Sequence, residues 1–210
     1  MTEPRTLART AGLLYLVVAG GGILTLLVSP GRSATADQLR AGATLFRIGL
    51  VSSLIAGICW LGTAMALYLL LRHVHQLAAA AMVTFVAVGV ANSYLGVADD
   101  YLALRIALDH KDSRFTRLLL DSGTPIDAVL FGLWLVPLGY LVIRSGYFPK
   151  VLGIFLIAGC VGYLVGGVVF ALGPLSELAF MAWLLMPGPR TRSAALPATD
   201  ADVGARNRTR

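Results

Sequence analysis

Six long apolar runs dominate the sequence. They cover residues 11–28, 43–71, 77–98, 127–143, 151–172 and 175–186. A helix needs about 20 apolar residues to cross the roughly 30 Å hydrocarbon core of a bilayer. The first, second, third and fifth runs reach that length, whereas the fourth and the sixth are short. The runs predict an all-α integral membrane bundle of six transmembrane helices.

The composition agrees with a membrane location and excludes several other classes of protein. Only 13% of the residues are charged and 57% are hydrophobic, whereas soluble domains carry about 25% charged residues. The apolar runs are continuous, so they lack the alternation of polar and apolar residues that a transmembrane β-barrel requires. The sequence is therefore that of neither a soluble globule nor a disordered chain.

The net charge of +6 comes from basic residues at the ends of the apolar runs and from a basic C-terminal tail. This distribution does not form the basic stripe of a nucleic-acid-binding domain. It favours contact with anionic lipid head groups at the membrane surface. We expect a transmembrane domain over residues 1–188 and a flexible basic tail over residues 189–210, with no nucleic-acid partner. The tail region carries Arg190, Arg192, Arg206, Arg208 and Arg210.

The connections between the runs predict how the chain is oriented. With six crossings, the N-terminus, the turns near 72–76 and 144–150 and the tail share one side. That side carries ten lysine and arginine residues and the opposite side seven, and the cytoplasmic side is usually the more basic one. We therefore expect a protein of the cell membrane with both termini in the cytoplasm.

Six polar residues form one constellation that could bind a ligand. Under the predicted topology the five charged members fall toward the outer side of the membrane, and Asn92 lies on the same helix face as Asp99. A charge costs about 2.5–3.5 kcal/mol at the centre of a spanning helix, so such residues need a reason. The set could bind a cation or a polar ligand, or its members could simply gather where polar residues must, at helix ends. The candidate cluster consists of Arg47, Asn92, Asp99, Asp100, Asp127 and Glu177.

Glu177 is the most informative member of this cluster. Counted from Pro187 it lies about 15 Å along the sixth helix, and counted from Pro174 it lies only about 5 Å deep. A carboxylate at such a depth suits a site for a proton, a cation or a substrate amine. Alternatively, it caps the start of the sixth helix, where the helix dipole favours a negative charge. Asp127 follows a Thr-Pro pair and could likewise be a capping residue.

Two helices carry small residues at four-residue spacing. Gly49, Ser53 and Gly57 share one face, and Gly162 and Gly166 share another. Such faces let helices approach one another closely. They predict close packing within the bundle or a homodimer contact.

The sequence contains no motif that indicates catalysis or cofactor binding. It has no G-x-S-x-G, no H-E-x-x-H, no Walker loop and no dinucleotide fingerprint. His73 and His75 lack a third ligand, and Cys59 and Cys160 each stand alone in an apolar run, so neither pair predicts a metal site. We expect no cofactor and no bound metal.

Several stretches together resemble a known family. They are ARTAGLLYL at 8–16, LFRIGL at 45–50, ALYLLLR at 66–72, the turn IRSGYFPK at 143–150, SEL at 176–178 and WLL at 183–185. These stretches resemble the DUF4386 family of small bacterial multi-pass membrane proteins. Two features depart from the pattern: Phe85 precedes Val86 where relatives often have arginine, and the region before Glu177 is short. The resemblance extends to Gly188 and implies the membrane fold, but it assigns no activity and no catalytic residue.

The leading interpretation is a non-enzymatic integral membrane protein that acts as an interaction, lipid-binding or sensing component. The alternative is a small transporter or an ion- or proton-coupled carrier that uses the outer acidic cluster and Glu177, since intramembrane acids and interrupted helices are typical of such sites. An intramembrane enzyme with a carboxylate base is a third interpretation. It has the least support, because no nucleophile or metal set accompanies the acid.

Overall fold

The computed structural model describes residues 4–28, 34–110, 113–120 and 126–185 of the chain. Nearly all of these residues are helical and none forms a strand, which confirms the all-α class. The basic tail expected at 189–210 lies outside the described residues. The elements in chain order are α1 (Pro4–Val28), α2 (Ala36–Ala41), α3 (Ala43–Leu71), α4 (Gln76–His110), α5 (Ser113–Leu120), α6 (Ile126–Leu133), α7 (Leu135–Ser145), α8 (Lys150–Val165), η1 (Gly167–Ala171) and α9 (Leu172–Leu185).

In the described part of the chain, five helices are long and apolar enough to cross a membrane. A further apolar helix, Lys150–Val165, has 16 residues and is about 24 Å long, which is less than the roughly 30 Å hydrocarbon core. The multi-pass class is therefore supported, but the count of six spanning helices is not confirmed. The five candidates are Arg5–Val28, Ala43–Leu71, Gln76–Asp109, Ile126–Ser145 and Gly167–Leu185.

The break between the last two apolar runs is not where the sequence predicts it. α8 ends at Val165, and α9 starts at Leu172 instead of at residue 175. The chain turns at Gly166 and Gly167, whose φ angles of 70° and 59° lie in the left-handed region that glycine tolerates best. Pro174 lies in the first turn of α9, where its missing N–H removes no intrahelical hydrogen bond. The last span is therefore longer than its apolar run indicates.

The fourth span is interrupted at Trp134, between the end of α6 and the start of α7. Pro137 explains the interruption, because proline cannot donate to the carbonyl four residues earlier and its ring clashes with that carbonyl. The neighbouring helical bond, from the Trp134 N–H to the Leu130 oxygen, is correspondingly long at 3.5 Å. The side chain of Trp134 is fully buried in the core.

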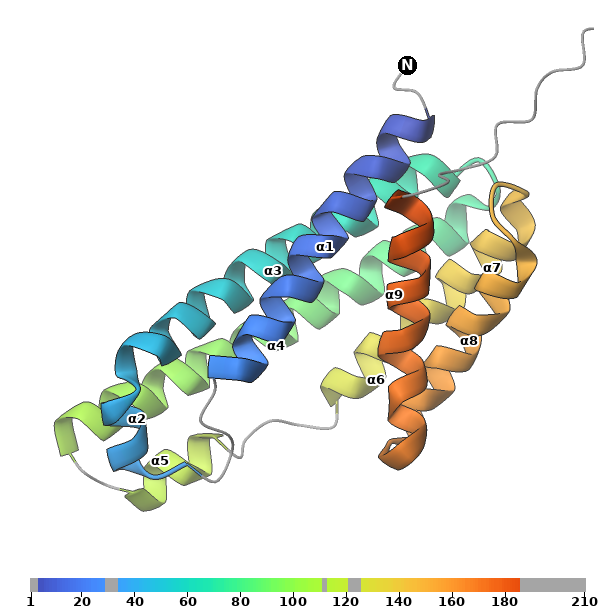
Figure 1. Cartoon of the computed structure of the whole chain (residues 1–210). Helices are drawn as coiled ribbons and strands as arrows, with labels where there is room; N and C mark the ends of the chain where they lie inside the picture. The colour runs from blue at the N-terminus through green and yellow to red at the C-terminus, as the bar shows by residue number, and fades with distance from the viewer. Residues whose placement is uncertain (1–3, 29–33, 111–112, 121–125, 186–210) are drawn as a thin grey trace, which may run out of the picture.

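The third helix continues well beyond its apolar run, which ends at residue 98. α4 passes through Asp99 and Asp100 and reaches His110. Its 35 residues make it about 52 Å long, so it extends past the hydrocarbon core. Figure 1 shows that α2 and α5 lie beside the far end of α4.

The buried residues form two separate clusters. The larger cluster lies within the long helices and includes Trp134 and Phe180. The smaller cluster joins α2, the start of α3, the end of α4 and α5 through residues such as Leu39, Phe46 and Leu104. In Figure 1, α2 and α5 gather at one end of the molecule, while the start of α1 and the end of α9 lie together at the other.

Most of the helix faces that carry the predicted small residues pack against other elements of the same chain. A Cβ atom at Gly162 would lie 2.6 Å from the Val169 oxygen of η1, so the close contact predicted at Gly162 is confirmed. A Cβ atom at Gly166 would meet no atom within 4 Å. The contact predicted there is wrong, because Gly166 belongs to the turn. Gly49 faces Val28 of α1, 2.7 Å from its Cγ2 by the same measure. A homodimer stays a prediction.

Candidate functional site

The structure brings two of the six candidate residues into direct contact. The side-chain amide of Asn92 on α4 donates a hydrogen bond to Oδ1 of Asp127 at 2.6 Å. Asp127 lies in the first turn of α6, where the helix dipole favours its charge. The pair therefore links α4 to the start of the fourth span.

The other candidates lie on different parts of the helices. Arg47 is exposed near the start of α3. Asp99 and Asp100 are partly buried on α4, seven and eight residues beyond Asn92 and thus about 10–12 Å farther along the helix. A single ligand site that uses all six residues stays a prediction.

Glu177 has partners that the sequence did not indicate. The indole Nε1–H of Trp134 donates to its Oε1 at 3.2 Å, and the hydroxyl of Tyr163 donates to its Oε2 at 3.3 Å. Glu177 also lies beyond the first turn of α9, which begins at Leu172. Its interpretation as a capping residue is therefore wrong, because its hydrogen-bond donors are aromatic side chains of neighbouring helices.

Local structure explains why these two donors reach Glu177. Trp134 lies at the kink of the fourth span and is held edge-on between the rings of Tyr15 and Trp60, each 5.9 Å away between centroids. Tyr163 packs its ring against the backbone of Gly173, where any larger residue would collide with it. The kink of the fourth span therefore positions Trp134, and the contact with Gly173 positions Tyr163, so that both side chains donate to Glu177.

Tyr15 of α1 is a third aromatic residue at this carboxylate. Its side chain is only 4% exposed and interacts electrostatically with Glu177. Its hydroxyl nevertheless makes no hydrogen bond of acceptable geometry with any described residue. A buried hydroxyl without a partner is uncommon and needs an explanation.

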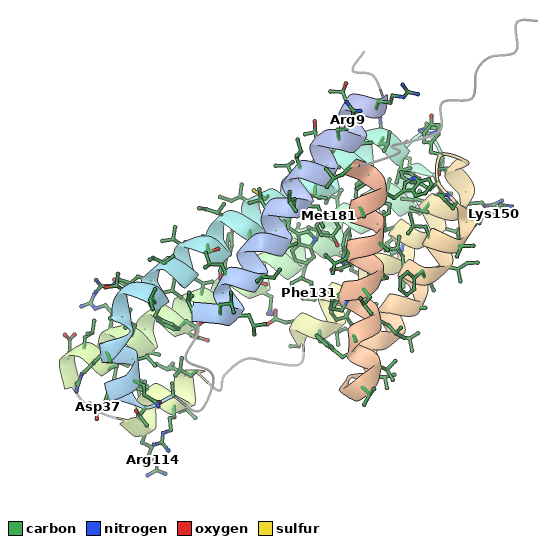
Figure 2. All side chains as sticks on the ribbon, in the orientation of Figure 1. Arg9, Asp37, Arg114, Phe131, Lys150 and Met181 are labelled. Carbon is green, nitrogen blue, oxygen red and sulfur yellow. The ribbon has the colours of Figure 1, made fainter. Side chains whose placement is uncertain are left out.

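A crevice of about 570 Å³ adjoins this group of residues. Tyr15, Trp60 and Glu177 line it together with Phe131 of α6 and Met181 of α9, and Figure 2 labels the last two. Most of its other lining residues are apolar or are small hydroxyl residues of α1, α3 and α4. Glu177 is the only charged residue that lines the crevice in the described part of the chain.

The crevice follows from the way in which α1 and α9 diverge. Near the start of α1 the two helices touch, since a Cβ atom at Gly12 would lie 2.9 Å from Leu185. Further along α1, a Cβ atom at Gly22, which lines the crevice, would meet nothing within 4 Å. Figure 1 shows the two ribbons converging at one end and separating toward the other. The open part of this α1–α9 seam is the mouth of the crevice.

Two histidines that could have suggested a metal site have structural roles. His75 accepts a hydrogen bond at Nδ1 from the Ala78 N–H at 3.1 Å, so it caps the start of α4. His73 packs its ring against Tyr147 at 5.3 Å between centroids. Within the described ranges, no group of three histidine, cysteine, aspartate or glutamate residues is placed to hold a metal ion.

Sequence reasoning identified Glu177 but missed the aromatic residues around it. Tyr15, Trp60 and Tyr163 come from three different helices and Trp134 from the break between α6 and α7, and no spacing in the sequence connects them. Pro137 and Gly173 were the available signals. Proline marks a place where a helix is interrupted, and glycine marks a place where a side chain can approach the backbone closely.

Comparison with known proteins identifies a family for this chain and assigns no activity. No curated protein and no solved structure matches the chain. The family model described as "Domain of unknown function (DUF4386)" matches residues 10–188, which is most of the chain and includes every residue of the crevice. On this evidence the chain belongs to the DUF4386 family.

Proposed function

We propose that this protein is a non-enzymatic membrane component that binds an amphipathic small molecule in the crevice between α1 and α9. The observation that carries the proposal is a crevice of about 570 Å³ with a largely apolar wall and one carboxylate. Ligand sites in proteins typically measure about 300–1,000 Å³ and combine an apolar wall with a few placed polar groups. These properties support a lipid-binding or sensing role.

Apolar side chains on both sides of the mouth favour entry of the ligand from the bilayer. On α1, Ile23 and Leu26 are 59% and 80% exposed. On α9, Leu175 and Leu178 are 53% and 45% exposed. Large apolar surfaces of this kind indicate contact with a membrane or a partner. A molecule dissolved in the bilayer would therefore reach the crevice without crossing water.

The proposed topology has six crossings, with α8 as the sixth and both termini in the cytoplasm. α8 is apolar and packs against both α7 and α9. With this crossing included, the start of α1 and the end of α9 lie on one side, as they do in Figure 1. Arg9 and Lys150 lie at that end of the molecule (Figure 2), and basic residues favour the cytoplasmic side.

A photoreactive probe tests the binding proposal. Purified protein in detergent is irradiated with a diazirine derivative of octanol, which is neutral and apolar. We expect labelling of peptides from α1 and α9 that contain crevice residues, and we expect excess octanol to suppress it. A Gly22→Phe variant should lose this labelling, because Gly22 lines the crevice and a side chain there would project into open space.

The matched control is Gly20→Phe. Gly20 lies on the same helix, is equally open and does not line the crevice. This variant should therefore keep the labelling. Labelling spread evenly over all the exposed helices, or labelling that is equal in the two variants, would contradict the proposal.

A small ion- or proton-coupled carrier is a second candidate function. Glu177 lies near the middle of the Gly167–Leu185 span. The helical path is interrupted at Gly166 and Gly167, where this span begins. Interrupted helices and intramembrane acids are typical of secondary transporters. Sealed proteoliposomes that contain a pH-sensitive dye separate the two functions: a proton-coupled carrier would move protons across the membrane in a Glu177-dependent way, whereas a binding component would move none.

A further inference from the structure

The carboxylate of Glu177 has unused capacity to accept hydrogen bonds. An ionised carboxylate offers about four acceptor positions, and the described contacts of Glu177 are the two neutral donors on Trp134 and Tyr163 together with an electrostatic contact with the hydroxyl of Tyr15. Both donors approach from the protein side, whereas Glu177 also lines the crevice. A donor that enters the crevice can therefore bind the same carboxylate.

The described residues do not provide a cation for Glu177. No lysine or arginine among them lines the crevice or lies within ion-pair distance of this carboxylate. A buried carboxylate is costly unless it is paired with a positive charge or neutralised. The crevice is therefore complementary in charge to a cationic occupant.

Aromatic groups that line the crevice add to this complementarity. Trp60 and Phe131 stack with their centroids 4.5 Å apart and their planes inclined by only 6°, and both line the crevice. Ring faces attract organic cations, and tryptophan does so most strongly. The unpartnered, buried hydroxyl of Tyr15 also lines the crevice, and its oxygen can accept a hydrogen bond from an ammonium group.

Resting on the binding function proposed above, we propose that the crevice selects a hydrophobic organic cation, with one amine on an apolar body and with Glu177 as its counter-ion. The ammonium group would bind Glu177 and the oxygen of Tyr15, and the apolar body would occupy the space toward the mouth. Trp134 and Tyr163 would hold the carboxylate in place from behind.

Other classes of ligand fit the crevice less well. A phosphate or carboxylate head group would face Glu177 without any basic residue in the described lining. A calcium ion requires six to eight oxygen ligands and magnesium near-octahedral coordination, whereas the lining offers a single carboxylate. A neutral alcohol would fit the apolar wall and could donate one hydrogen bond to the carboxylate, but it would leave the negative charge of Glu177 without a counter-ion.

Competition among three compounds that share the same eight-carbon chain tests this proposal. Octylamine, octanol and octanoate are each added at neutral pH to suppress the labelling by the photoreactive octanol derivative. We expect octylamine to suppress labelling at a concentration at least about tenfold lower than octanol, because only the ammonium group pairs a positive charge with the carboxylate of Glu177. Octanoate should be the weakest competitor.

Substitutions assign this preference to Glu177. Glu177→Gln keeps the size of the side chain and removes the charge, so it should abolish the advantage of octylamine while octanol still competes. Asp127→Asn is the matched control: it removes another carboxylate near the membrane that does not line the crevice, and the advantage should persist. If Glu177→Gln does not fold, the comparison of the three probes on the unmodified protein decides the question.

The outcomes separate this inference from the binding function on which it rests. If the unmodified protein shows no crevice labelling, the binding function itself fails. If crevice labelling occurs but octylamine and octanol compete equally, the binding function stands and the selection of a cation is wrong. An amine advantage that survives Glu177→Gln would also overturn the assignment of Glu177 as counter-ion.

Discussion

The seam between α1 and α9 has a glycine of α1 at each end, but the two helices are in contact at one end and apart at the other. At the closed end, Gly12 lies against Leu184 and Leu185 of α9. At the open end, Gly22 lines the crevice and faces no atom within 4 Å. Glycine permits two helices to approach, but it does not make them do so. The path of α9, which is determined by its contacts with α8, decides where the seam closes and where it becomes a crevice.

Substitution of Gly162 should have the largest effect on this seam. A Cβ atom there would collide with backbone atoms of η1 and α9, the Val169 oxygen at 2.6 Å and the Gly173 nitrogen at 3.1 Å. Backbone atoms cannot move aside as a flexible side chain can. We expect Gly162→Leu to lower the free energy of unfolding by about 3 kcal/mol, at the upper end of the usual range for overpacking.

Thermal unfolding in detergent measures this loss. Gly20→Leu is the control, because it adds the same side chain to a helix at a position with open space. If Gly162→Leu unfolds at the same temperature as the control, the close packing of α8 against α9 would be contradicted, together with its role in directing α9.

Removal of a donor to Glu177 should have an intermediate effect, at the point where the seam begins to open. Trp134→Phe keeps an aromatic ring in the core but deletes the Nε1–H that binds Glu177. We expect a loss of about 1 kcal/mol, in line with interhelical hydrogen bonds in membranes. The expected loss is small because Tyr163 still donates to the carboxylate.

A double-mutant cycle with Glu177→Gln identifies the source of this loss. If the hydrogen bond between the two residues matters, their stability effects should not be additive, because residues in direct contact are coupled. Additive effects would mean that Trp134→Phe acts only through packing and would remove this contact from the account of the seam.

The smallest expected effect is also the sharpest comparison of the two ends. Gly22→Ala should stabilise the protein by about 0.5 kcal/mol, because alanine is the better helix former and meets no obstacle. Gly12→Ala should destabilise it, because the added methyl group would approach Leu185 at 2.9 Å and Leu184 at 3.2 Å. Thermal unfolding of the two variants side by side should show shifts of opposite sign. Shifts of the same sign would mean that the seam is alike at both ends.

The site was only partly predictable from the sequence. The contact of Asn92 with Asp127 joins two residues of the predicted cluster, and a contact of this kind was within reach because both residues are polar and lie toward one side of the membrane. The partners of Glu177 were not within reach. Trp134 and Tyr163 lie 43 and 14 residues away in sequence, and their approach depends on a kink and on a glycine contact.

The apolar runs and the low charge of the sequence by themselves determined the class of this protein, an all-α membrane protein. They could do so because the cost of placing polar groups in hydrocarbon acts on each segment separately. The sequence also identified one acid deep in an apolar helix. The tertiary structure decided where α8 ends, where α1 and α9 separate and which aromatic side chains surround Glu177. These features depend on the rotation and tilt of whole helices, which are determined by packing between segments and not by the apolar content of any one of them.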